Sequence, residues 1–441
     1  MVDRFAHTFT SGPWGIGING QTFQQEAVVT HLGWQYAAYF GNGGILCAAR
    51  RKLPDGNWSV IRFTDYRIKD HKDVHNVAVI GICSGDGTVH LSYDHHEHPL
   101  HYRRSVRGLA SRPDTMEWKA ENFGQTTDEL EIGRPITRVT YPQFFSAPGG
   151  ELQFLYRLGA SGDGDWYLAE YSGDRGEWKV LGMLFSRAGE YQGDRSRCAY
   201  PDMLRYGPDS RLHVTWCWRE NYELRSNHDL CYAYSEDAGR TWRNNAGDQI
   251  AVLGSDPLAS RTIALETPGI VVAPIPMEWG LMNVTTQFVD AKGRVHVIRW
   301  QNPPDAAQPS KDLNAWRYCH YWHDSAGKWH RQLLPFYGRK PQVVVGKNGN
   351  IFVIYCQGHD LNYHQKVAAG VLKISAASEA SGWSDWTTVW ESERQFVGEP
   401  LTDNGRWNKA EILSVYAQEA PDTPGNPSPL HIVDFQSAGN Q

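Results

Sequence analysis

The feature that most limits how this chain can fold is a turn followed by an alternating apolar strand, which recurs seven times. Two examples are "GDGTVHLSYDHH" and "AKGRVHVIRW", in which a polar or glycine-containing turn leads into alternating apolar residues. The copies are separated by roughly 45 to 85 residues, which suits one four-stranded unit with loops of variable length. We anchor the seven copies on Ile45, Val89, Leu152, Leu212, Val295, Ile351 and Ile412.

Short strands, regular turns and the near absence of helical periodicity predict an all-β protein. Seven units favour a seven-bladed β-propeller, which protects its sheet edges by radial closure. No linker-like change of composition appears, so we expect residues 1–441 to form one domain rather than a sandwich with a second domain. We expect the N-terminal strand "QEAVVTH" (25–31) to close the ring beside "LHIVDF" (430–435). The turn "SEDAGRTW" (235–242) matches the Asp-box turn common in propellers.

Charge and hydropathy argue against two classes of partner. The chain has a net charge of −6 and a pI near 6.3, whereas a nucleic-acid-binding protein normally has a basic face. No apolar run approaches the ~20 residues that span a bilayer, so we expect no membrane partner. The 18 Trp and 21 Tyr fit β-sheets and surfaces that stack against sugar rings. We expect a monomer.

The cysteines and the N-terminus bear on the compartment. Seven cysteines lie mostly in apolar strand-like runs and form no CxxC pair, so we interpret them as buried free thiols. The start "MVDRFAHTF" lacks a charged region followed by an apolar segment, which fits a cytoplasmic protein or a mature secreted one. Sequons at Asn57 and Asn283 permit secretion, and we expect an extracellular location.

Hairpin geometry predicts a cluster of polar side chains at one mouth of the channel. In an antiparallel hairpin, the start of the first strand lies beside the end of the second. Three inner strands begin 11 to 14 positions before an anchor, at His75, Tyr141 and Tyr200. The second strands end 5 to 7 positions after the same anchors, at His95 or His96, Arg157 and Arg219. Imidazole and phenol groups suit proton transfer, and arginine suits carboxylate binding.

Other readings of these residues stay open. His98 and His101 lie on a turn and a third strand, where we expect surface or structural roles, and His90 is expected to pack in the core. The two tyrosines of the cluster precede proline and could instead pack between blades. Arg157 lies in the apolar run "FLYRLG" and needs a partner, which is either a bound anion or a buried salt bridge.

Several enzyme classes lack their signatures. No carboxylate pair recurs at matching positions, which weakens a two-carboxylate glycosidase. No glycine-rich phosphate loop or GxSxG elbow is visible. A sialidase is disfavoured because there is one good Asp box and no recognisable arginine triad.

Motifs between Val74 and Trp242 resemble the BNR-repeat propeller polysaccharide lyases, namely the ulvan lyases and relatives that act on L-rhamnose linked α-1,4 to D-glucuronate. They include "DVHNVAVIGICSGDGTVHLSYDHHEHPLHYRRS", "VTYPQFF", "AYPDMLRY" and "NHDLCYAYSEDAGRTW", whereas the remainder follows the repeat alone. The resemblance implies a uronate site formed by His75, His95, Tyr141, Arg157 and Tyr200, with His96 as the alternative to His95. We expect the substrate-binding residues to be His96, Arg219, Asn76 and Trp218.

The reaction implied by the resemblance is β-elimination, and the predicted cluster fits it. The reaction removes the C5 proton of a uronate and expels the O4 substituent. Arg157 would neutralise the carboxylate and stabilise the developing charge. We assign the base to His75 or His95, and regard Tyr141 and Tyr200 as proton donors or substrate positioners.

The expected substrate is a uronate-containing polysaccharide. The rhamnose–glucuronate unit occurs in ulvan and in arabinogalactan side chains such as those of gum arabic. The sequons and the Trp-rich composition favour release of terminal rhamnose from the latter, which would leave an unsaturated uronate. The alternatives are an endo-acting ulvan lyase, an α-L-rhamnosidase on the same linkage, and a non-catalytic carbohydrate-binding propeller.

We expect no organic cofactor, and the sequence does not define a metal site. Cys217, His228 and Cys231 offer nitrogen and sulfur ligands, but their spacing is not diagnostic of zinc. We favour Ca²⁺ held in the channel by carbonyl oxygens and water over Zn²⁺.

Overall fold

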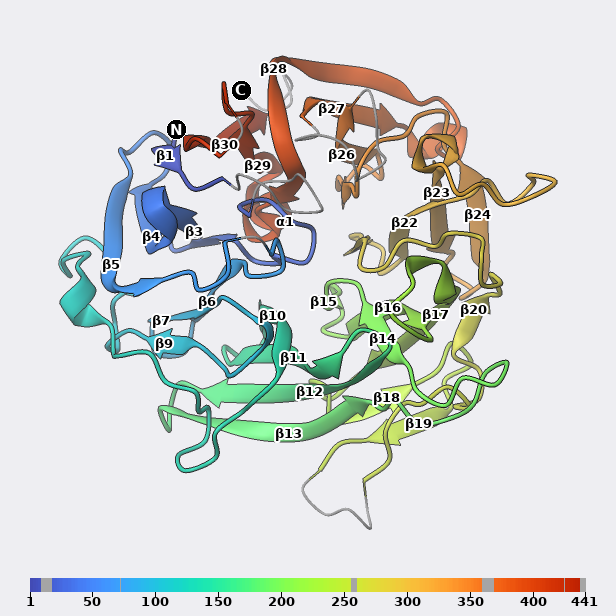
Figure 1. Ribbon diagram of the computed structural model, residues 1–441, viewed down its shortest axis with the longest axis horizontal. Coiled ribbons are helices and arrows are strands. Elements are labelled where there is room, and N and C mark those ends of the chain that lie inside the picture. Colours follow the sequence, from blue (N-terminus) through green and yellow to red (C-terminus); the bar gives the residue numbers. More distant parts are fainter. Residues whose placement is uncertain (9–17, 72, 255–259, 359–368, 424, 437–441) are drawn as a thin grey trace.

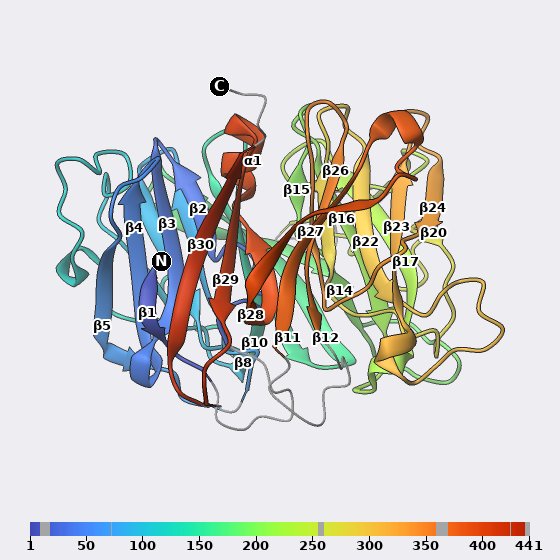
Figure 2. The ribbon, with the colours of Figure 1, turned by 90° about the horizontal axis from the view of Figure 1, so that it is seen from above.

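The computed structural model describes residues 1–8, 18–71, 73–254, 260–358, 369–423 and 425–436. Within these residues the protein is all-β, and its one α-helix is the short α1 (Asn404–Ala410). The sheets stand around a common centre, and β1 (Asp3–Ala6) lies beside β30 (Ser428–Gln436) (Figure 1). Figure 2 shows α1 and strand β8 (His96–His98) at opposite faces of the molecule.

The seven repeat anchors mark seven antiparallel strand pairs. Each anchor is the first or second residue of the second strand of its pair, as the repeat predicted. The pairs are β3 (Trp34–Gly41) with β4 (Ile45–Lys52), β6 (Ala78–Cys83) with β7 (Thr88–Tyr93), β10 (Val139–Ser146) with β11 (Leu152–Ala160), β14 (Cys198–Pro201) with β16 (Leu212–Arg219), β21 (Thr286–Val289) with β22 (Val295–Gln301), β25 (Gln342–Val345) with β26 (Ile351–Gly358), and β28 (Thr387–Thr402) with β29 (Ile412–Glu419).

Further strands extend each pair outward. A simple example is the four-stranded sheet in which β23 and β24 continue β21 and β22. The outer strands are β5 (Ser59–Arg67), β9 (Tyr102–Arg104), β12 (Asp163–Ser172), β13 (Glu177–Phe185), β17 (Asn227–Ser235), β18 (Thr241–Arg243), β19 (Gln249–Val252), β23 (Arg317–His323), β24 (Trp329–Leu333), β27 (Gly370–Ala377) and β30 (Ser428–Gln436). Three short strands lie off these paths: β2 (Val28–His31), β15 (Arg205–Tyr206) and β20 (Val271–Ala273).

The strand that joins the two ends of the chain differs from the predicted one. Segment 25–31 contains β2, which pairs with β3 and not with β30. The strand beside β30 is β1 (Asp3–Ala6), which also contacts β3. The prediction was wrong because two of the four residues of β1 are charged, whereas β2 begins with two valines and so has the stronger apolar signal in the sequence.

Local features follow the expected chemistry. The Asp-box turn is closed by Asp237, which accepts hydrogen bonds from Ser235 and from the backbone and hydroxyl of Thr241, while Trp242 is buried. All seven cysteines are free and buried, as predicted. His90 is a core residue bonded to Thr88 and Tyr102, also as predicted.

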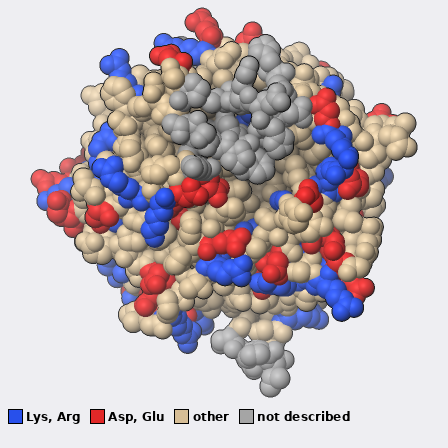
Figure 3. Space-filling model, viewed as in Figure 1, with Lys and Arg blue, Asp and Glu red and all other residues tan. Residues whose placement is uncertain are grey.

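Surface charge is mixed. On the face shown in Figure 3, acidic and basic side chains are interspersed among uncharged ones. None of the described helices is long and apolar enough to cross a membrane.

Candidate active site

A cavity of about 410 Å³ collects side chains from several repeats. Strand register explains the convergence, because Thr140 lies opposite Arg157 and Cys198 lies opposite Arg219. The start of each inner strand therefore meets the end of the next strand at one mouth, as the hairpin argument predicted. The ionisable residues that line the cavity are Asp70, Asp73, His75, His96, Tyr141, Arg219, Tyr222, Lys340 and Glu399.

Asp73 holds two histidines side by side. Its Oδ1 lies 2.6 Å from His75 Nδ1, and its Oδ2 contacts His96 Nδ1. The two imidazole rings stack with centroids 4.1 Å apart, and the other face of the pair is covered by Phe23, stacked 5.1 Å from His75. Because both Nδ1 atoms contact the carboxylate, the Nε2 atoms remain for chemistry in the cavity.

The charges of this group are set by burial and by the shared carboxylate. Burial lowers the pKa of His75 to about 4, although the hydrogen bond to Asp73 acts in the opposite direction. Burial alone would raise the pKa of Asp73, but the hydrogen bonds with His75 and His96 outweigh it and lower that pKa. At neutral pH, His75 is therefore a neutral imidazole oriented by an ionised carboxylate.

His96, and not His95, faces the cavity. His95 is fully buried, and its Nε2 accepts a hydrogen bond from the backbone N–H of His101 at 2.7 Å. The sequence favoured His95, but His96 lines the cavity and His95 is buried outside it, so a catalytic role for His95 stays a prediction. His101 is buried and structural, bonded to Tyr66 and Lys69.

Tyr141 projects from an irregular point of β10. Its φ is +58°, and the pairing of β10 with β11 shifts register between Thr140 and Gln143. Such a conformation is costly for an aromatic residue and is typical of functional sites, where a bulge re-aims a side chain. Burial and the nearby Tyr200 raise the pKa of Tyr141, against the opposing effect of Arg157. The phenol therefore keeps its proton at neutral pH.

Arg157 lies behind the tyrosines rather than in the cavity. It is fully buried, its guanidinium carbon is 4.9 Å from the centroid of Tyr141, and its Nη1 donates to Tyr200 Oη at 3.3 Å. No carboxylate among the described residues forms an ion pair with it. The side chain does not line the cavity, so the expected contact of Arg157 with a substrate carboxylate stays a prediction.

Tyr200 and Arg219 complete this wall. Tyr200 is buried, donates to Ser161 Oγ at 3.3 Å, and accepts from Arg219 Nη1 at 3.5 Å. Arg219 lines the cavity, but its other nitrogens bond the backbone oxygens of Asn221 and Tyr222. Tyr200 thus does not line the cavity itself but bonds two residues that do, Ser161 and Arg219.

Two predicted substrate-binding residues are elsewhere. Asn76 is fully buried and donates to the backbone oxygen of Asp70 at 3.3 Å, so it shapes the loop before β6. Trp218 is fully buried beside Phe185 and Trp216. Neither side chain lines the cavity, so a role of Asn76 or Trp218 in substrate binding stays a prediction.

Three cavity residues were missed by the sequence reasoning. Asp73 precedes His75 by two positions, and a carboxylate at this distance from a candidate catalytic histidine is a signal that could have been used. Lys340 and Glu399 are both nearly fully buried and come from later repeats, in which no motif was recognised. Only the three-dimensional fold brings them to the site.

Potential metal ligands gather at a different place from the one considered. In the described part of the chain, one group of three or more His, Cys, Asp or Glu side chains has ligand atoms within 4.8 Å of one another: Asp73, His75 and His96. Both nitrogens of His228 are engaged, by Glu220 and Asp229, so they are not directed to the two cysteines considered with it. The Ca²⁺ expectation stays a prediction.

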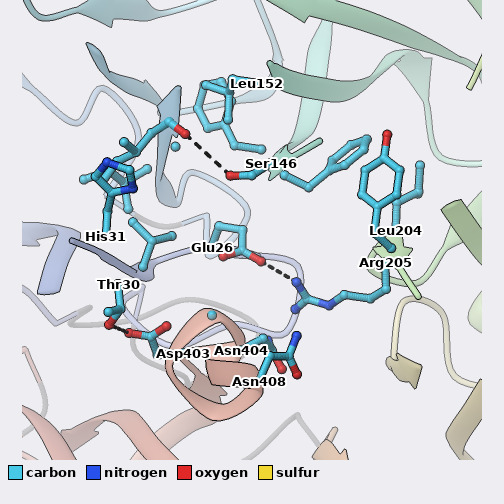
Figure 4. Close-up of a pocket in the computed structure, with 18 residues that line it drawn as sticks. Glu26, Thr30, His31, Ser146, Leu152, Leu204, Arg205, Asp403, Asn404 and Asn408 are labelled. Atoms are coloured by element: carbon cyan, nitrogen blue, oxygen red, sulfur yellow. Dashed lines mark hydrogen bonds and ion pairs between the residues drawn. The ribbon is translucent and has the colours of Figure 1, made fainter. Parts of the chain in front are cut away.

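A second cavity, of about 260 Å³, lies near α1 (Figure 4). Glu26 and Arg205 form an ion pair of 2.6 Å across it, with side chains 11% and 14% exposed. Asp403 accepts hydrogen bonds from Thr30 and Gln35 and caps α1. The two carboxylates of this cavity, Glu26 and Asp403, therefore both accept hydrogen bonds from groups of the protein itself.

Comparison with known proteins agrees with this architecture. Residues 34–335 match the family described as "BNR repeat-containing family member". Over nearly all of both chains, the structure superimposes on the polysaccharide lyase Uly1 with a TM-score of 0.73 at 18% identity, covering 98% of this chain and 97% of that one. An ulvan lyase bound to -[GlcA(1-4)Rha3S]- gives a TM-score of 0.70 at 13% identity, covering 98% and 96%. The protein thus has the fold of these polysaccharide lyases.

The curated relatives that match this chain are also named ulvan lyases. A long-isoform ulvan lyase of Pseudoalteromonas sp. (strain PLSV) is 22% identical over 345 residues, covering 70% of this chain and 33% of the relative. A long-isoform ulvan lyase of Glaciecola sp. (strain KUL10) is 22% identical over 408 residues, covering 83% and 37%. This chain therefore spans about a third of the length of these relatives. Because the family match covers more than half of the chain, the protein belongs to the BNR repeat-containing family.

Proposed function

We propose that the protein is a polysaccharide lyase that cleaves the bond at O4 of a uronate by β-elimination. The observation that carries this proposal is the neutral His75, oriented by Asp73, beside the protonated Tyr141 in one cavity. The ring centroids of His75 and Tyr141 are 5.7 Å apart, so a base and an acid reach the same sugar. The fold shared with polysaccharide lyases supports it.

In this mechanism His75 removes the C5 proton. A neutral imidazole whose Nδ1 contacts a carboxylate accepts a proton at Nε2, and Asp73 stabilises the imidazolium that forms. His96 shares the carboxylate and stacks on His75, so it holds the base in place. The electron pair of the broken C–H bond forms the new C4–C5 double bond, and O4 leaves.

Tyr141 protonates the leaving O4. Its raised pKa keeps the phenol protonated until the leaving oxygen develops charge. Buried Arg157 lies over the ring of Tyr141 and stabilises the phenolate that remains after transfer. Tyr200 links Arg157 to Arg219 and positions this wall.

For the substrate, we propose the rhamnose–glucuronate linkage. The names of the curated relatives and the saccharide bound by one structural neighbour support a glycan of this type. Terminal rhamnose release from gum arabic and endo cleavage of ulvan are the two versions to be separated. We further propose that residues 1–441 form one monomeric, seven-bladed propeller that acts outside the cell; the seven strand pairs and β1 beside β30 support the ring.

The test is parallel incubation of the purified protein with gum arabic and with ulvan. A lyase yields the ultraviolet absorbance of an unsaturated uronate, and a rhamnosidase yields rhamnose without it. Early release of free rhamnose indicates terminal attack, whereas a rapid fall in polymer size indicates endo attack. Binding without any product would favour a carbohydrate-binding propeller and reject the enzyme.

A further inference from the structure

One loop at the cavity of Asp73 and His75 has a strained backbone. Val284 has a φ of +38°. This left-handed conformation is an outlier for a β-branched residue, because the branched side chain crowds the backbone there. Such strain persists only where the surrounding structure enforces it, and it is concentrated at binding and catalytic sites. The residue before Val284 is Asn283, which lines the cavity.

A buried ion pair holds the loop on both sides of Val284. Arg299 and Asp202 are fully buried, and Arg299 Nη2 donates to Asp202 Oδ2 at 2.8 Å. On one side, the backbone N–H of Thr285 donates to Asp202 Oδ1 at 2.7 Å. On the other side, Arg299 Nη1 donates to the backbone oxygen of Met282 at 3.4 Å. The strained residue and its neighbour in the cavity therefore lie between two anchored positions.

Asn283 has the same place in its repeat as His75 has in another. Asn283 lies three residues before β21, and His75 lies three residues before β6. Hairpin geometry brings residues at this position to the same mouth. The side chain of Asn283 is partly buried, and no hydrogen bond to its amide is found among the described residues. Its two N–H donors and its carbonyl oxygen are therefore available to a ligand.

The lining of the cavity follows the ring of strand pairs. His75 precedes the pair β6–β7, Tyr141 lies in the pair β10–β11, Arg219 in β14–β16, and Asn283 precedes β21–β22. In Figure 1, β6 and β22 stand on opposite sides of the common centre. In a pyranose ring, C2 is the carbon opposite C5. A uronate whose C5 faces His75 therefore directs its C2 hydroxyl toward the other side of the cavity.

We propose that Asn283 binds the 2-hydroxyl of the substrate uronate and so selects the sugar that enters the cavity. This role rests on the proposed function, because it takes His75 as the group that faces C5. A neutral amide suits a hydroxyl, since it can donate to the hydroxyl oxygen and accept the hydroxyl proton. A site built to hydrogen-bond a hydroxyl rejects the analogue that lacks it. Asn283 acts in binding and orientation, and the proton transfers belong to other residues.

A binding test probes this assignment without requiring turnover. Calorimetric titration compares methyl D-glucuronide with its 2-deoxy analogue, neither of which has a sugar at O4 to expel. We expect the wild type to bind the first ligand about three- to tenfold more tightly, and N283A to bind both equally. The matched control N57A removes an exposed asparagine just before β5 and should keep the wild-type preference. A wild type without the preference, or an N283A variant that keeps it, would overturn the proposal.

A kinetic test separates lost binding from lost structure. On a rhamnose–glucuronate oligosaccharide, N283A should raise KM by about three- to tenfold and change kcat much less. On the same oligosaccharide without the 2-hydroxyl, wild type and N283A should have equal KM values. Equal losses on both substrates would mean that Asn283 supports the fold instead. If no lyase activity exists, the proposed function fails, and the preference for the 2-hydroxyl in the binding test still decides the role of Asn283.

Discussion

The two cavities of this molecule contain similar residue types and use them differently. In the cavity near α1, Glu26 and Arg205 bind each other, and Asp403 is held by Thr30 and Gln35. In the cavity that includes β8, Asp73 orients two imidazoles whose Nε2 atoms have no partner among the described residues, and Lys340 has no paired anion.

The two cavities differ in whether their buried charged groups are paired with other groups of the protein or remain available to bind a ligand. Paired buried ions satisfy each other and leave little to offer a substrate. Unpaired buried polar groups cost stability, and proteins keep them mainly where binding or catalysis uses them. On this criterion we propose that the cavity of Asp73 is the active site and that the cavity of Glu26 and Arg205 is structural.

The largest expected effect comes from removing the base. His75→Ala should lower kcat by about 10²–10⁴-fold, because it removes the proposed base. The rate of formation of the unsaturated uronate measures it. An unchanged melting temperature would show that the fold persists, and near-wild-type turnover would remove His75 from the mechanism.

Removal of the acid should have the next largest effect. Tyr141→Phe keeps the ring and its contact with Arg157 but removes the proton, so we expect a loss of about 10²-fold in kcat. A saccharide with a better leaving group at O4 should recover part of the loss, because it needs less protonation. A Tyr141→Phe variant as active as the wild type on both substrates would rule out this role.

The adjacent histidines provide a matched pair. His96→Ala should lower activity by about tenfold or more with little change in stability, because His96 supports His75 in the cavity. His95→Ala should instead lower the free energy of unfolding by about 1–3 kcal/mol, because the N–H of His101 loses its acceptor. Activity per folded molecule and thermal unfolding measure the two effects, and the reverse outcome would make His95 the catalytic member of the pair.

Asp73 gives a pH signature. Activity needs neutral His75, so it should stay level as the pH falls from neutral and then decline as the pH passes about 4. The hydrogen bond to Asp73 raises the pKa of His75, so Asp73→Asn should move this decline to lower pH and reduce kcat more than it raises KM. A pH profile that does not move would mean that Asp73 does not act through His75.

The smallest effect on activity is expected in the other cavity. Arg205→Met leaves Glu26 buried without its partner and should lower stability by up to about 3 kcal/mol, since Glu26 can take up a proton. The double variant with Glu26→Gln should recover part of that loss. Turnover per folded molecule should stay at the wild-type level, and a large fall would contradict the structural role of this cavity.

Sequence reasoning found the units of the fold because each repeat carries its own local signal. A turn followed by alternating apolar residues is sufficient to place Leu152 or Ile351 at the start of a strand. Ring closure was harder, because β1 is short and its pairing with β30 joins residues from the two ends of the chain. No local sequence pattern indicates that β1 pairs with β30.

In the site as well, some residues follow from local sequence patterns and others only from the three-dimensional fold. His75, Tyr141 and Arg219 follow from hairpin register, which sequence reveals directly. The choice between His95 and His96 depends on where the strand alternation begins, a shift of one residue that the motif does not fix. Lys340 lies in no recognised motif, and its lack of a paired anion is a property of three-dimensional packing.

The most direct test of elimination is cleavage in water enriched in heavy oxygen. Elimination breaks the bond between C4 and its oxygen without adding water, so neither product should contain heavy oxygen when sampled before the anomeric hydroxyl exchanges with water, and one product should carry the conjugated double bond. The His75→Ala variant should form neither product at a comparable rate. Heavy oxygen in a product that lacks the double bond would show hydrolysis, and would contradict the proposed roles of His75 as base and Tyr141 as acid.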